Sequence, residues 1–123
     1  DHLLRICKIS GVDDFVGSHP KGYDLQVRER GLGLSGGQKQ TINLARSLLH
    51  DPKVLLLDEP TSSMDQASES KIISALAEQC GDKTMIIVTH RNPILNIVDR
   101  VFVFENGKIL ADQSPEQLGL KKG

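Results

Sequence analysis

Two adjacent acidic residues directly follow a run of aliphatic ones. Asp58 and Glu59 come after Val54–Leu57, whose unbroken apolar character predicts a strand buried on both faces of a parallel sheet. Such a strand would hold Asp58 rigidly, as a Mg²⁺ ligand requires. Glu59 would be placed to orient a water molecule and accept its proton during attack on a phosphate. The alternative is that Asp58, Glu59 and Pro60 form only a polar turn that ends the strand.

A serine, two glycines and a glutamine open the helix that is predicted upstream of this strand. Ser35 and Gln38 are spaced as a capping box, while Gly36 and Gly37 allow a ligand to approach the backbone closely. The free amides and the positive end of the helix dipole attract anions. The segment therefore suits a phosphate-binding turn, although taken alone it favours an ordinary glycine-containing helix cap.

One histidine follows a second predicted strand. His90 comes after Met85–Val88, with Thr89 between them. A neutral imidazole there could donate to a phosphate oxygen or hold the attacking water. The alternative is an ordinary loop histidine. The histidines to which no role is assigned are His2, His19 and His50.

Helices and strands that alternate along the chain would position these residues. The expected helices are Asp1–Ser10, Val12–Val16, Ser35 to Asp51-Pro52, Gln66–Cys80, a short one from Asn92-Pro93, and a start at Ser114–Gln117. The expected strands are Val54–Leu57, Met85–Val88 and the hairpin Val101–Phe104 with Lys108–Ala111. This order predicts an α/β domain with a parallel sheet, in which ligands bind beyond the carboxyl ends of the strands.

The buried faces of the longer helices follow from their apolar periodicity. The expected core positions are Leu3, Leu4, Ile6 and Cys7 in the first helix, Ile42, Ala45, Leu48 and Leu49 in the helix after Ser35, and Ile72, Ile73, Leu76 and Cys80 in the helix after Gln66.

Composition limits the classes of function. The chain has 123 residues, which fits one domain at most, and its formal net charge of −1 gives no indication of nucleic-acid binding. Cys7 and Cys80 have no metal-ligand spacing, and we interpret them as reduced thiols. No apolar run reaches the length of a membrane span, so a membrane link would come through a partner or another part of the polypeptide.

These motifs together resemble the ATP-binding cassette (ABC) family in their order and spacing. Leu34–Gln38 matches the family's signature motif, and Val54–Ser62 looks like its Walker B motif running into the next loop. Asp65 matches the D-loop aspartate, although Ser63-Met64 departs from the more usual Ala-Leu. His90 matches the switch histidine. The resemblance covers nearly the whole chain.

The resemblance implies a P-loop NTPase-like fold and a division of roles between two nucleotide domains that face each other head to tail. Residues 1–50 would be part of the helical subdomain, and residues 51–123 the C-terminal part of a RecA-like catalytic core. Asp58 as the metal ligand, with Glu59 and His90 as catalytic residues, would serve one ATP. The nucleotide-binding residues of the signature and D-loop, implied to contact the ATP of the facing domain, are Ser35, Gly36, Gly37, Gln38 and Asp65.

One family motif does not occur in this sequence. No Gly-x-x-x-x-Gly-Lys-[Ser/Thr] phosphate loop, the Walker A motif, occurs in the 123 residues. The resemblance places that loop upstream of residue 1, so the sequence is expected to be a truncated domain. By itself the chain is expected to be inactive and to bind ATP no tighter than about millimolar.

A finer resemblance precedes the signature. Gly22–Asp24 followed by Val27–Gly31 is similar to the segment that ABC exporters place against the coupling helices of their membrane domain. Gln26–Gly31 most resembles bacterial type I secretion ATPases, although exporters more often have Glu at the position of Gln26 and Gly at that of Arg28. The implied function is export of a protein at the cytoplasmic face of the inner membrane, powered by ATP and Mg²⁺.

Three other interpretations fit this sequence less well. In a split ABC-type ATPase of chromosome maintenance or DNA repair, this half would emerge from heptads, and residues 1–33 show none. Soluble ABC proteins of translation usually carry two cassettes and basic linkers, which this sequence lacks. A non-enzymatic interaction module is disfavoured by the intact Asp58, Glu59 and His90.

The resemblance also predicts how the chain associates. In the family's sheet order, the missing Walker A strand lies between the strands Met85–Val88 and Val101–Phe104. Its absence would leave two apolar strands with unpaired edges, which favours aggregation. Either the hairpin Val101–Ala111 closes against Met85–Val88 within one chain, or segments are exchanged between chains. The second is favoured, so the expected result is self-association through the exposed sheet, by exchange of segments about the connection Asn92–Asp99.

Overall fold

Helices and short strands alternate along the chain. The computed structural model describes residues 1–120. The helices are α1 (His2–Ser10), α2 (Val12–Gly17), α3 (Gly36–Leu48) and α4 (Gln66–Gln79), with 3-10 turns η1 (Gly22–Asp24), η2 (Glu29–Gly31) and η3 (Asn92–Ile97). The strands are β1 (Val54–Asp58), β2 (Thr84–Val88), β3 (Val101–Glu105) and β4 (Lys108–Gln113).

The strands form two separate pairs. β1 and β2 are parallel, in a register that places Asp58 opposite Val88, and β3 and β4 form an antiparallel hairpin. Asn106 and Gly107 turn the hairpin with φ of 49° and 74°, as a type I′ turn requires. The predicted parallel pairing and the predicted hairpin are both confirmed. Within residues 1–120, β2 is not hydrogen-bonded to β3.

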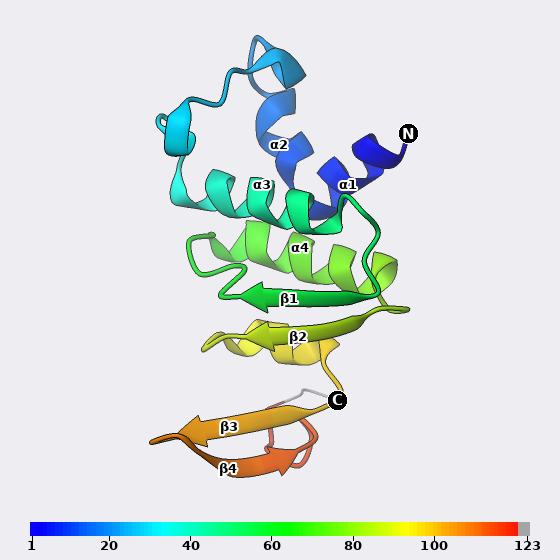
Figure 1. Cartoon of the computed structure of the whole chain (residues 1–123), viewed down its shortest axis with the longest axis vertical. Helices are drawn as coiled ribbons and strands as arrows, with labels where there is room; N and C mark the ends of the chain where they lie inside the picture. Colours follow the sequence, from blue (N-terminus) through cyan, green and yellow to red (C-terminus); the bar gives the residue numbers. More distant parts are fainter. Residues whose placement is uncertain (121–123) are drawn as a thin grey trace.

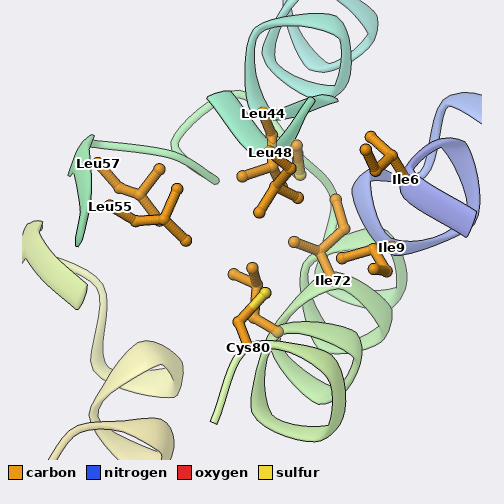
Figure 2. Close-up of a cluster of buried hydrophobic side chains, with 10 residues drawn as sticks. Ile6, Ile9, Leu44, Leu48, Leu55, Leu57, Ile72 and Cys80 are labelled. Atoms are coloured by element: carbon orange, nitrogen blue, oxygen red, sulfur yellow. The ribbon is translucent and has the colours of Figure 1, made fainter. Parts of the chain in front are cut away.

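The helices stack on one face of the parallel pair (Figure 1). Figure 2 shows the core where Leu55 and Leu57 of β1 meet α1, α3 and α4. The buried residues of this cluster are Ile6, Ile9, Leu44, Leu48, Leu55, Leu57, Met64, Ile72, Leu76 and Cys80. Because the cluster combines residues from both sides of position 50, the two predicted subdivisions share one core, and the domain boundary itself stays a prediction. Of the second subdivision, residues 121–123 lie outside the described part of the chain.

Local signals explain where the helices begin and end. α1 ends at Gly11, whose φ of 81° is the left-handed conformation that glycine adopts at low cost. α3 begins with the capping box of Ser35 and Gln38, and Asp65 caps α4. In Figure 1 the amino ends of α3 and α4 lie on the same side of the molecule as the carboxyl ends of β1 and β2. That side therefore gathers the polar residues predicted to do chemistry.

The prediction that β1 and β2 are buried on both faces is wrong. Leu56 is 72% exposed, and Ile86 and Val88 are 55% and 60% exposed. The helices cover only the face that carries Leu55 and Leu57, and no described segment covers the other. A continuous apolar run shows that both faces tolerate burial, but it does not show what covers them.

Smaller corrections concern helix faces and ends. Leu3, Leu4 and Leu49 were expected in the core and are exposed, whereas Thr41 and Leu44 are buried. The predicted helix start at Ser114–Gln117 forms only turns, although the reciprocal bonds between Ser114 and Gln117 are present. A cap without a sufficient number of helical residues after it does not nucleate a helix.

The exposed face predicts self-association of the 123-residue chain at micromolar concentration. Contiguous exposed apolar side chains on a strand pair favour contact with another copy. Static light scattering is expected to give a mass above the 13.5 kDa of one chain. Leu56→Lys, on the exposed face, is expected to shift the population toward monomer. A monomeric wild-type chain would contradict this expectation.

Candidate functional site

Asp58 and Glu59 lie where β1 ends. The amide of Glu59 donates to the carbonyl of Val88 at 2.8 Å, so the chain leaves the strand while still attached to β2. Glu59 has a φ of 45°, an unusual and strained conformation for a residue with a side chain. The side chain of Asp58 is exposed and makes no hydrogen bond or ion pair within residues 1–120. The turn thus presents two carboxylates in different settings.

The structure brings Glu59 and His90 together. Nδ1 of His90 lies 2.8 Å from Oε1 of Glu59. The His90 side chain is 77% exposed, whereas that of Glu59 is 34% exposed. The second carboxylate oxygen, Oε2 of Glu59, is buried and has no hydrogen-bond partner in the described chain. A buried acceptor without a donor is costly, and a water or ligand would satisfy it.

The capping box leaves donors free at the signature turn. Oγ of Ser35 accepts from the amide of Gln38 at 3.1 Å, and Oε1 of Gln38 accepts from the amide of Ser35 at 2.9 Å. The hydroxyl proton of Ser35 and the side-chain amide protons of Gln38 are not used by these bonds. Together with the amides of the first turn, they provide donors to an anion at the amino end of α3.

Gly36 and Gly37 have a second reason to be glycines. A Cβ on Gly36 would lie 3.0 Å from Cβ of Ser63, and a Cβ on Gly37 would lie 3.1 Å from the Ser63 carbonyl oxygen. The amino end of α3 therefore packs directly against the loop that follows β1. Their predicted contact with nucleotide stays a prediction.

Asp65 has a structural function in this chain. Its Oδ1 accepts from the Ser68 amide at 2.9 Å and its Oδ2 from the Ser68 hydroxyl at 2.8 Å. These bonds lower the pKa of the Asp65 carboxyl below its ordinary value. The cap is therefore present above the ordinary pKa of an aspartate and is lost as the pH falls through the lowered value. The nucleotide contact predicted for Asp65 stays a prediction.

A buried ion pair, which the sequence reasoning missed, holds the segment after His90. The guanidinium of Arg91 contacts both carboxylate oxygens of Glu69, each at 2.7 Å, and the Thr61 hydroxyl donates to Oε1 of Glu69 at 2.7 Å. The side chain of Glu69 is 2% exposed. The only signal in the sequence is a charged residue on a helix face that is otherwise apolar.

Gln40 is the second residue that the sequence reasoning missed. Its side chain extends from α3 and bonds to the carbonyl oxygen of Glu59, the hydroxyl of Ser62 and the amide of Ser63. A glutamine one turn into a helix gives no local signal, because its partners lie 19 to 23 positions further along the chain.

The residues present fit a Mg²⁺ ion that takes few ligands from the protein. Asp58 is an unengaged carboxylate on a rigid strand end. Within residues 1–120 no group of three or more His, Cys, Asp or Glu side chains is arranged to hold a metal. Mg²⁺ at nucleotide sites is usually held by one or two carboxylates, substrate phosphates and waters, so a single aspartate suffices.

Comparisons with known proteins agree on one family. The sequence model described as "ABC transporter" matches residues 15–62. ABC multidrug transporter mdr1 of Aspergillus fumigatus is 44% identical over 98% of this chain, and P-glycoprotein 14 of Caenorhabditis elegans is 42% identical over 94%. The chain spans 9% of the length of each of these relatives.

A solved structure has the same fold. The structure of a bacterial Atm1-family ABC exporter with ATP bound matches 95% of this chain and 20% of its own, with a TM-score of 0.85 and 34% identity. In the described part of this chain, no helix combines the length and apolar character needed to cross a bilayer. The predicted α/β ATPase fold is thereby confirmed, and the chain belongs to the ABC transporter family, as part of its ATPase domain.

Proposed function

We propose that this chain is part of the ATP-hydrolysing domain of an ABC exporter, within a longer protein. The observation that carries the proposal is the 2.8 Å contact between His90 and Oε1 of Glu59, which leaves the buried Oε2 without a partner in the described chain. One oxygen is then held in place, while the other keeps its full capacity to accept a hydrogen bond or a proton. ATP is the substrate of the proposed reaction.

Each residue of the site has a task in this proposal. The Glu59 carboxylate would accept the proton of the attacking water. His90 would donate from Nδ1 to the carboxylate and keep it oriented, and with both ring nitrogens protonated it would also donate from Nε2 to the transferred phosphate. Asp58 would bind Mg²⁺, which supplies positive charge to the phosphates when bound. Ser35 and Gln38 would donate to the γ-phosphate of an ATP bound by a second nucleotide-binding domain.

The exporter-like segment supports a membrane-domain partner. Tyr23, Val27 and Leu32 expose apolar surface around η1 and η2, where the resemblance places coupling helices. We propose a location at the cytoplasmic face of a membrane, with a transmembrane domain of the same transporter bound there. We also propose that this membrane is a bacterial inner membrane. The relatives do not decide this point, because they include proteins of a fungus and a nematode.

Two substrate classes follow from different observations. Residues 26–31 resemble type I secretion ATPases and favour a protein substrate. The names of mdr1 and of other relatives describe multidrug transport and favour small molecules. The isolated 123-residue chain is proposed to be inactive in either case, because it contains no Walker A motif.

Removal of Mg²⁺ tests the proposed chemistry. In the full-length protein, excess chelator is expected to abolish ATP hydrolysis, and Asp58→Asn is expected to raise the Mg²⁺ concentration for half-maximal turnover about tenfold or more. Asp99→Asn, an exposed carboxylate outside the site, is the control. Phosphate release measured across a Mg²⁺ titration checks this. Turnover that persists in chelator would contradict the proposal.

A further inference from the structure

One glutamine joins the signature helix to the turn that carries Glu59. Nε2 of Gln40 donates to the Glu59 carbonyl oxygen at 3.0 Å and to Oγ of Ser62 at 2.7 Å. Its Oε1 accepts from the Ser63 amide at 3.0 Å. Both ends of one side-chain amide are therefore used, and neither Nε2 nor Oε1 is free to turn toward solvent without breaking bonds.

These bonds act on a backbone that would not hold its shape alone. Glu59 has a φ of 45°, which is unfavourable for a residue with a side chain and persists only where neighbours fix it. Its amide is fixed by the Val88 carbonyl, and its carbonyl is fixed by Gln40 and by the Ser62 amide. Loss of the Gln40 bond would free the peptide plane next to the atom that carries the Glu59 side chain. The carboxylate would then move relative to His90.

The same loop is in close contact with the signature turn. Ser63 lies against Gly36 and Gly37 so tightly that a methyl group on either would meet it at 3.0–3.1 Å. The first turn of α3 and residues 59–63 therefore have little room to move independently. Gln40, one turn further along α3, is the polar part of this contact.

We infer that Gln40 is a positioning residue for Glu59, which ties the carboxylate to the signature turn of the same chain. The inference rests on the proposed function, since it requires Glu59 to act in hydrolysis. In the head-to-tail arrangement, the signature turn serves one ATP and Glu59 the other. Gln40 would thus connect the two sites through a path of hydrogen bonds within one chain.

The first test replaces Gln40 by methionine in the full-length protein. Gln40→Met keeps the length of the side chain and removes all its hydrogen bonds. The kcat for ATP is expected to fall roughly 10- to 100-fold, because a small displacement of a catalytic group has an effect of this size. The KM is expected to change less than about twofold, since both polar atoms of the Gln40 side chain are bonded to residues 59–63 of the same chain. The matched control is Gln79→Met, at the exposed end of α4, with wild-type kinetics expected.

The second test separates positioning from damage to the fold. In a Glu59→Gln background, adding Gln40→Met is expected to change the residual hydrolysis less than about twofold, because its effect runs through Glu59. The positioning role of Gln40 is overturned if Gln40→Met lowers hydrolysis by the same factor in both backgrounds, or if Gln40→Met alone turns over as fast as wild type. Neither result would affect the proposed function. If Glu59→Gln leaves turnover unchanged, the proposed function is overturned and the inference with it.

Discussion

Replacement of Glu59 by glutamine is expected to leave ATP binding intact and to slow hydrolysis roughly 10²- to 10⁴-fold in the full-length protein. A glutamine amide has nearly the same shape as the carboxylate, and its oxygen can still accept from His90, so the 2.8 Å contact is kept. It cannot accept a proton from the attacking water. The strained φ at this position is also unchanged, so stability is not expected to fall.

The measurement compares nucleotide affinity with single-turnover hydrolysis. Glu105→Gln, an exposed carboxylate at the end of β3, is the matched control and is expected to behave as wild type. If Glu59→Gln turns over within about a factor of two of wild type, Glu59 is not the catalytic carboxylate. Loss of ATP binding in the variant would equally contradict the proposed role, because it would show a binding function.

Loss of Arg91 is expected to have the largest effect on stability. In Arg91→Met, Glu69 remains buried at 2% exposure and, within residues 1–120, retains only the Thr61 hydroxyl as a donor to Oε1. Breaking a buried ion pair by removal of one partner costs about 3–5 kcal/mol, because the remaining charge is uncompensated. For an ATPase domain of ordinary size, the temperature of inactivation is expected to fall by about 10 °C.

The double variant Glu69→Leu with Arg91→Met isolates the cause. It removes both charges and is expected to recover much of the lost stability, since apolar residues of similar volume often replace a buried pair without loss. Lys71→Met on the same helix breaks the exposed pair with Asp14 and is the control, with a cost of about 1 kcal/mol at most. Equal inactivation temperatures for Arg91→Met and Lys71→Met would show that loss of the buried ion pair costs no more stability than loss of the exposed one.

Signals that act over a few residues were enough to predict much of the fold. The capping box at Ser35, the stop at Gly11 and the turn at Asn106-Gly107 each depend on neighbours within the same segment, and each forms as expected. The proximity of Glu59 and His90 followed from a rule about parallel sheets, since both follow strands that lie side by side.

Contacts made by long side chains across the fold could not be predicted. Gln40, Glu69 and Arg91 meet partners from other elements, and their partners are set by packing that no local pattern encodes. The exposure of Leu56 and Ile86 was missed for a related reason. An apolar strand can be buried on both faces, but whether each face is buried depends on which other segments pack against it.

The ion pair of Glu69 and Arg91 also limits how this sequence can diverge. A mutation that replaces either residue alone creates an intermediate with an unpaired buried charge, which selection on stability would remove. Lysine at position 91 would not restore the two-point contact, because it lacks the planar guanidinium. Positions 69 and 91 are therefore expected to change together among descendants of a common ancestor, and most lineages are expected to keep both.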